Sequence, residues 1–236
     1  MNLFAVYHIY PHLYWKKHVE NKLNRIKKYN LFLNNLKLYC VIIQPKKEDL
    51  EWLNETCKKY NEDIKILQVN ENYVEHESIK LVKKIGDEND GFTLYFHTKG
   101  CANNASLKKS VLSWDELMSY ITIDRWNDCI KKLENYNCIG ANFIMGAMPK
   151  HFSGNFWWAR NDYIKKLQKV DHPNTWRFHY EFWIGYVNSL EDMNPFCPYR
   201  SPFSFDNYAN EVQEHWYKNI NFEKNYLHEF TPNVKN

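Results

Sequence analysis

The sequence predicts an α/β fold, with helices on both faces of a mainly parallel β-sheet. In the first hundred residues, short runs rich in β-branched and aromatic residues alternate with longer segments whose apolar residues recur at helical spacing. Strands separated by single helices favour parallel pairing through right-handed crossovers. The length of 236 residues is within the range that one α/β domain can fill, so one large core over residues 1–236 is expected.

Four strands and three helices are expected in the first half. The strands are expected at residues 2–9, 36–43, 64–69 and 91–97. The helices between them are marked by apolar residues at helical spacing: Val19, Leu23 and Ile26, then Leu50, Leu53 and Cys57, then Ile79, Val82 and Ile85. Gly86 is expected to end the third helix, because glycine readily takes the left-handed conformation that follows a helix.

The second half begins with a long helix over residues 114–133, for which Ser113 to Glu116 form a capping box. Beyond Glu191, three prolines interrupt the pattern, and the tail is expected to be mostly loops. The other expected elements are strands at 139–144 and 152–159, a short helix at 161–167, a helix that begins near Asn174 or Thr175, and a helix near 207–219.

Composition and charge exclude several classes of protein. The net charge of +3 is too small for a nucleic-acid-binding surface, and the basic residues between Lys16 and Lys28 are spaced as a solvated helix face. The six cysteines form no C-x-x-C pair, so neither a zinc site nor a disulfide framework is expected. No apolar stretch approaches 18 residues, and the first ten residues lack the features of a signal peptide. We therefore expect no membrane span and a cytoplasmic location.

The positions of the glycines exclude the common phosphate-binding loops. All seven glycines lie at position 86 or beyond, so the turn after the first strand cannot form a glycine-rich loop. Dinucleotide-binding domains, methyltransferases and P-loop proteins need glycine there for close approach of the backbone to phosphate or cofactor. His8 and His12 are four residues apart, but Pro11 between them argues against a metal-binding pair on one helix face.

Two segments carry residue types that suit a ligand site. In the first, a buried strand runs into His97, Thr98, Lys99 and Gly100, which places a cation at the edge of the sheet where ligands bind in such folds. The alternative is a surface loop with a glycine turn, and a satisfied buried histidine is the commoner explanation of His97.

The second segment runs from His151 to Arg160. Its small polar residues Ser153, Gly154 and Asn155 would let the backbone approach a ligand while Trp157 and Trp158 stack on it. The alternative is a core strand with a glycine bulge, in which His151 is an ordinary buried histidine.

With these residues, the chain resembles glycosyltransferases of the GT-A fold, and more closely the small bacterial and large-virus sugar transferases related to the rhamnan synthesis F group. The resemblance covers roughly residues 1–190 and depends on His97 to Gly100, the helix at 114–133 and the run from Ser153 to Trp158. It implies a nucleotide-binding half at 1–100, an acceptor-side half at 101–190 and a covering segment at 191–236.

The resemblance also implies the roles of individual residues. The donor would be held by Tyr7, His8, Tyr10, His97, Thr98, Lys99 and Gly100, with the base against the first three. The sugar or acceptor would be held by His151, Ser153, Gly154, Asn155, Trp157 and Trp158. The metal-binding Asp-x-Asp of such enzymes is replaced here by His97-Thr98-Lys99, so no metal ligand and no required cofactor are expected, although manganese or magnesium remains open.

Inverting sugar transfer needs a carboxylate to take the proton of the acceptor hydroxyl, whereas a retaining enzyme would not need that base. Glu181 matches the position that the resemblance implies, and Lys99 would stabilise the leaving diphosphate. The alternative for Glu181 is an ion pair with Arg177 on a helix surface. Other acids remain open: Asp162, which more often serves the helix dipole, and Asp171, Glu191 and Asp206.

These observations predict a transferase that moves a sugar from a nucleotide-sugar donor to a glycan or glycoprotein acceptor. Two alternatives belong to other classes. A non-catalytic carbohydrate-binding or degenerate transferase domain would keep aromatic rings without a cation beside a diphosphate. An oligomerising structural protein would use the same rings as interface anchors.

Overall fold

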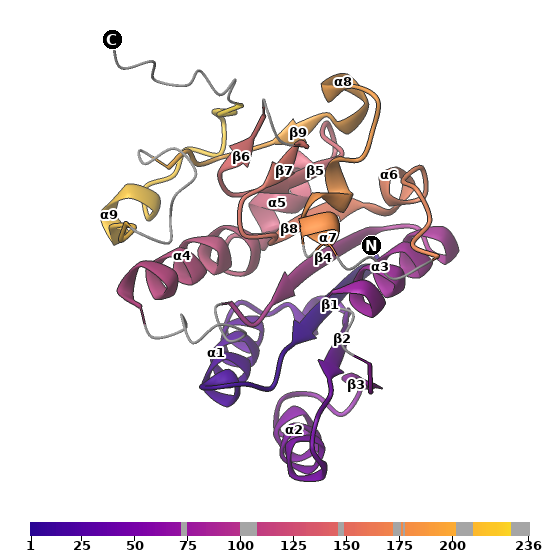
Figure 1. The fold of residues 1–236 in the computed structure, drawn as a ribbon. Helices are drawn as coiled ribbons and strands as arrows, with labels where there is room; N and C mark the ends of the chain where they lie inside the picture. Colours follow the sequence, from indigo (N-terminus) through magenta and orange to yellow (C-terminus); the bar gives the residue numbers. More distant parts are fainter. Residues whose placement is uncertain are drawn as a thin grey trace.

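A central β-sheet organises the computed structural model, which describes residues 1–71, 75–99, 108–145, 149–171, 176, 178–201 and 210–227 (Figure 1). Within these residues the sheet has seven strands in the order β3-β2-β1-β4-β8-β5-β9. They are β1 Leu3–Ile9, β2 Leu36–Ile43, β3 Lys65–Val69, β4 Phe92–His97, β5 Cys138–Gly140, β8 Trp157–Arg160 and β9 Pro195–Phe196. A separate antiparallel pair is formed by β6 Phe143–Ile144 and β7 His151–Phe152.

The direction of the strands decides which loops meet. Strand β1 lies between β2 and β4 and runs parallel to both, with His8 opposite His97 in the register of β1 and β4. Strand β8 runs antiparallel to β4, with Tyr95 opposite Trp157. The beginning of β8 therefore lies at the same edge of the sheet as the ends of β1 and β4.

Helices cover both faces of this sheet. The side chains of β1 alternate between the two faces, and each face carries its own hydrophobic cluster. The first cluster is completed by α1 Trp15–Lys28, α2 Lys47–Tyr60, α4 Lys109–Ser119 and α5 Trp126–Lys132. The second is completed by α3 His76–Glu88, α6 Asn161–Ile164 and α7 Phe178–Phe182. The predicted fold class, a mainly parallel sheet with helices on both faces, is confirmed.

The remaining described elements are short: the 3-10 helices Phe32–Asn34 and Trp183–Gly185, the π-helix Tyr120–Asp124, α8 Leu190–Met193 and α9 Glu214–Tyr217. Within the described ranges, no helix is both long and apolar enough to cross a membrane. The cysteines at 40, 57, 129, 138 and 197 are buried free thiols, and Cys101 lies outside the described residues.

The expectation that Gly86 ends the third helix is wrong. Helix α3 continues to Glu88, and Gly86 lies within it. A Cβ atom at this position would lie 2.3 Å from Cγ2 of Ile164. The glycine is therefore explained by the close approach of α6 to α3, and not by a left-handed turn.

The expected start of the long helix at Ser113 is also wrong. Helix α4 begins at Lys109, and the Ser113 hydroxyl donates to the carbonyl of Ser110 at 3.0 Å and accepts from the amide of Val212 at 2.8 Å. The hydroxyl thus binds the C-terminal segment and does not cap the helix. The helical stretch is interrupted by the π-helix before α5 begins at Trp126.

Each of the two strands expected between 139 and 159 is divided in two. Asn142 has a φ of 49°, and Gly154 and Asn155 have φ values of 89° and 59°, which a β-strand cannot include. Strands β5 and β8 join the central sheet, while β6 and β7 pair with each other. Strand β9, where Pro195 pairs with Cys138, was not predicted because it is two residues long and lies in the proline-rich tail.

The expected helix beginning near residue 174 is seen from Phe178 as α7, and residues 172–175 lie outside the described part of the chain. Helix α9 falls within the helix expected near 207–219, although residues 202–209 are not described.

A buried ion pair joins α1 to α4. Lys22 was expected on a solvated face, but it is fully buried, with Nζ 2.5 Å from Oδ2 of Asp115 and 2.6 Å from the hydroxyl of Ser119. His18 lies 3.9 Å from the same carboxylate oxygen. Burial alone would raise the pKa of Asp115, but the charges of Lys22 and His18 outweigh it and hold this pKa below its ordinary value. Asp115 is therefore ionised in the interior only while its cationic partner is present.

Replacing Lys22 by methionine is expected to lower the free energy of unfolding by about 3–5 kcal/mol, because the carboxylate of Asp115 would stay buried without its partner. Unfolding in urea measures this loss. The double variant Lys22→Met/Asp115→Leu is expected to recover most of it, and Lys17→Met, at an exposed position of the same helix, is the control.

The same pair predicts a dependence on pH. Because the folded pKa of Asp115 is lowered, its stabilisation is present above the unfolded pKa and is lost as the pH falls through the folded pKa. Wild-type protein should thus lose stability in acid faster than the double variant. A Lys22→Met variant as stable as wild type at neutral pH would contradict this account.

Candidate functional site

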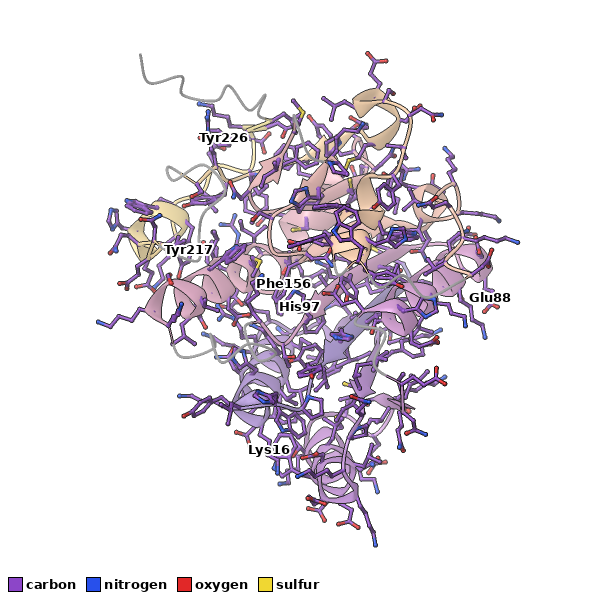
Figure 2. The ribbon with its side chains drawn as sticks, viewed as in Figure 1. Lys16, Glu88, His97, Phe156, Tyr217 and Tyr226 are labelled. Atoms are coloured by element: carbon purple, nitrogen blue, oxygen red, sulfur yellow. The ribbon has the colours of Figure 1, made fainter. Side chains whose placement is uncertain are left out.

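The turns that follow β1 and β4 are joined to each other by hydrogen bonds. The amide of Thr98 donates to the carbonyl of His8 at 3.0 Å, and the amide of Tyr10 donates to the hydroxyl of Thr98 at 3.0 Å. Figure 2 shows His97 beside Phe156 near the middle of the molecule, where their ring centroids are 5.1 Å apart. Four of the residues predicted to hold a donor therefore lie together: His8, Tyr10, His97 and Thr98.

Both histidines at this edge are neutral at pH 7. Burial lowers the pKa of His97 to about 4, and the charge of Lys99 lowers it further. Burial also lowers the pKa of His8 to about 4, against the opposing charge of Glu75. Nε2 of His97 donates to the carbonyl of Gly154 at 2.9 Å, and Nδ1 of His8 lies 2.9 Å from the hydroxyl of Ser78. These side chains can form hydrogen bonds here, but they carry no charge.

The turn before β8 binds two carboxylates. The amide of Gly154 donates to Oε1 of Glu181 at 3.4 Å, and the side-chain amide of Asn155 donates to Oε2 of Glu75 at 2.7 Å. Gly154 has a φ of 89°, and a Cβ atom at this position would lie 2.9 Å from Cζ2 of Trp114, so a larger residue would strain the turn against α4. The turn therefore has a fixed position relative to both acids.

Glu75 was not predicted from the sequence. It directly precedes α3, at the edge where β3 ends, and its Oε2 also accepts from the hydroxyl of Tyr95 at 2.7 Å. The signal that could have found it is an acid at the start of a helix that follows a strand. That signal is weak, because acids are common in the first turn of helices for the sake of the dipole.

Glu181 lies in α7 and is partly buried. Its charge acts on His97, on His151 and on Tyr95, which shows that these side chains face a common region. Burial lowers the pKa of His151, whose Nδ1 donates to the carbonyl of Pro149 at 2.7 Å. The alternative partner considered for Glu181, Arg177, lies outside the described residues.

Lys99 is buried, with 4% of its surface exposed, and its ammonium lies 3.9 Å from the centroid of a Trp114 ring. Such a cation–π contact stabilises an ammonium that has lost much of its water. The charge of Lys99 also acts on His97, so the cation lies near the turn after β4. Thr98 is buried next to it, and Gly100 lies outside the described residues.

The aromatic residues predicted to contact ligand are in the core. Trp157, Trp158 and Tyr7 have no exposed surface. The indole of Trp158 donates to the carbonyl of Thr122 at 2.6 Å, and Tyr7 stacks on Phe96 with ring centroids 4.4 Å apart. Because these rings are buried, they cannot stack on a sugar or a base, and that expectation is wrong. Trp157 and Trp158 instead belong to a core strand, which was the alternative.

The other acids considered are not brought to this edge. Asp162 pairs with Arg160, the last residue of β8, which lies at the opposite edge of the sheet. Asp171 and Glu191 are exposed, and Asp206 lies outside the described residues. In the part of the chain that the structure describes, no three histidine, cysteine, aspartate or glutamate side chains converge in a group that could hold a metal ion.

The chain belongs to the family described as Domain of unknown function (DUF8361), whose model matches residues 7–219. No curated protein matches it. Among solved structures, 4-diphosphocytidyl-2C-methyl-D-erythritolsynthase from Anaerococcus prevotii DSM 20548 is similar over 91% of this chain and 92% of that chain, with 10% sequence identity and a TM-score of 0.41.

Replacing Trp157 or Trp158 by alanine is expected to lower the free energy of unfolding by about 3–5 kcal/mol, because each change leaves a large cavity in the core. Unfolding in urea measures the loss. Trp176→Ala, which removes an indole that is 49% exposed, is the matched control and should cost far less. If either core variant keeps wild-type stability, the assignment of that ring to the core is wrong.

Proposed function

We propose that this member of the DUF8361 family transfers a sugar from a nucleotide-sugar donor to a glycan acceptor. The observation that supports it best is the convergence of two carboxylates and a buried lysine at one edge of the sheet. Glu75 and Glu181 both bind the turn at Gly154 and Asn155, and Lys99 follows the adjacent strand. Ligands of α/β sheets bind at the edge where the parallel strands end.

In the proposed reaction, the acceptor hydroxyl oxygen attacks the anomeric carbon of the donor sugar. The bond from that carbon to the diphosphate oxygen breaks, its electron pair leaves with the diphosphate, and the hydroxyl proton passes to a carboxylate. Positive charge is needed beside the diphosphate, where negative charge accumulates. Lys99 supplies that charge in this scheme, in the role that a metal ion plays in Asp-x-Asp enzymes.

Glu181 is better placed than Glu75 to be the base. One oxygen of Glu75 already accepts two hydrogen bonds of 2.7 Å, from Tyr95 and Asn155, so this acid serves to hold the turn. Among the described residues, Glu181 accepts one longer bond of 3.4 Å, from the amide of Gly154. Its lone pairs are less engaged, and it can take the hydroxyl proton.

Glu181→Gln is expected to lower the transfer rate by roughly 10²- to 10⁴-fold, because the amide keeps the shape but cannot take a proton. Initial rates and the donor dissociation constant measure the two effects, and the latter should be unchanged. Glu191→Gln, at an exposed position of α8, is the control and should keep full activity. The assignment of Glu181 as the base would be refuted by unchanged turnover in Glu181→Gln, or by retention of the anomeric configuration in the product.

The donor is to be identified by the thermal stability of the protein with UDP-, GDP- and dTDP-sugars, each with manganese and with EDTA. A ligand at a hundred times its dissociation constant stabilises the folded protein by about 2.7 kcal/mol. If Lys99 takes the place of the metal, the shift should be as large in EDTA as in manganese.

A charge-assisted hydrogen bond is worth about 1.5–3 kcal/mol, so Lys99→Ala should weaken binding or turnover roughly ten- to a hundredfold.

The outcomes separate the candidate functions. In one outcome, EDTA abolishes binding and turnover, and manganese restores them. That result would show that carboxylates hold a metal and that the role given to Lys99 is wrong. Binding of glycans without turnover of any nucleotide sugar would favour a non-catalytic carbohydrate-binding domain instead.

A further inference from the structure

Two aromatic residues are exposed beside the proposed base. Trp176 is 49% exposed and Phe178 is 36% exposed, and their ring centroids lie 6.1 Å apart. Both also contact the buried ring of Phe182, at 5.5 Å and 5.9 Å. The three rings form one continuous cluster, with its outer part open to solvent. Single exposed apolar residues are common on proteins, but rings in contact on the surface point to an interaction.

The cluster and Glu181 belong to the same short element. Phe178 and Phe182 are four residues apart in α7 and stack with an interplanar angle of 14°, and Glu181 is three residues after Phe178. Residues three and four apart are neighbours on a helix surface. Phe182 also contacts the ring of His151, at 4.5 Å between centroids, on the strand that leads into the turn of Gly154. The exposed rings are thus connected to the proposed site through one buried phenylalanine.

We propose that Trp176 and Phe178 form an acceptor subsite, on which the sugar unit next to the accepting one stacks. This inference rests on the proposed function. The axial C–H groups of a pyranose form an apolar face that matches an aromatic ring, while its hydroxyls point sideways to polar groups and water. A chain that stacks on these rings can place its terminal hydroxyl at Glu181, because ring cluster and carboxylate share α7.

A second protein chain fits this surface less well. A stable protein interface buries about 800 Å² on each partner, which two partly exposed rings do not provide by themselves. A glycan needs only one or two such rings together with polar groups nearby. The cluster therefore suits a sugar unit better than a protein partner.

The test uses the full chain with the nucleotide sugar that binds in the donor panel, and with methyl glycosides of common hexoses and the matching disaccharides as acceptors. Wild type should prefer the disaccharide, because only that acceptor reaches the rings. Trp176→Ala and Phe178→Ala should each raise the KM for the disaccharide roughly tenfold and remove the preference, with little change for the monosaccharide. Trp176→Phe, which keeps a ring, should restore much of the affinity.

Two further readouts exclude a merely structural role. Hydrolysis of the donor by water and the donor dissociation constant should be unchanged in both alanine variants, since neither involves the acceptor. Leu33→Ala removes an 80% exposed apolar residue that precedes β2, at the opposite edge of the sheet, and should leave all values unchanged.

The two proposals fail in different ways. If wild type neither hydrolyses nor transfers any donor sugar, the proposed function is wrong and the subsite falls with it. If wild type transfers sugar but the alanine variants keep its KM and its preference, only the subsite is wrong. A wild-type dimer in light scattering that Trp176→Ala converts to a monomer would likewise overturn the subsite and assign the rings to an interface between copies.

Discussion

The side chain of Asn155 holds the candidate site together. Its amide donates to Glu75 and its oxygen accepts from the indole of the buried Trp157, so one residue connects an acid before α3 to the core under β8. Its backbone is left-handed, with a φ of 59°, a conformation that asparagine tolerates better than most residues. Few side chains could satisfy this position, because it needs a donor, an acceptor and a left-handed backbone at once. The turn that contacts both carboxylates depends on these three properties.

The electrostatics of the site follow from burial. Because His8 and His97 are buried, their pKa values fall to about 4, and they remain neutral while Lys99 and the two glutamates provide the charges. Lys99 is kept in place by the indole of Trp114, and the next residue along α4 is Asp115, which binds the buried Lys22. The ion pair between α1 and α4 thus fixes the helix against which Lys99, the residue proposed to bind the diphosphate, is packed. A cation held in this way needs little reorganisation when negative charge develops beside it.

Much of the fold, and less of the site, could be predicted from the sequence. Strands β1 to β4 have strong local patterns and were predicted within one residue at each end. Helices α1 to α3 were predicted between them from the spacing of their apolar residues, and only the end expected for α3 was wrong. Between 139 and 159 the strand boundaries predicted from the apolar pattern were wrong, because left-handed residues divide two apolar runs that look continuous in the sequence. The mistake at Ser113 has another origin: its hydroxyl bonds to Val212, almost a hundred residues away, which no local motif can reveal. Glu75 was missed for the same reason, since its partners Tyr95 and Asn155 are distant in the chain.

The exposed and buried aromatic residues illustrate the limit of local pattern most clearly. The indoles of Trp157 and Trp158 were predicted to contact ligand because small polar residues precede them. A strand in the middle of a sheet that is covered on both faces leaves no ring exposed. Trp176 and Phe178 carry no such signal, yet both are exposed. A helix of five residues has little stability of its own, so α7 is held by the packing of Tyr180 and Phe182. The position of Glu181 is therefore set by aromatic packing, and under the proposed function Phe182 supports the acceptor subsite and the base at the same time.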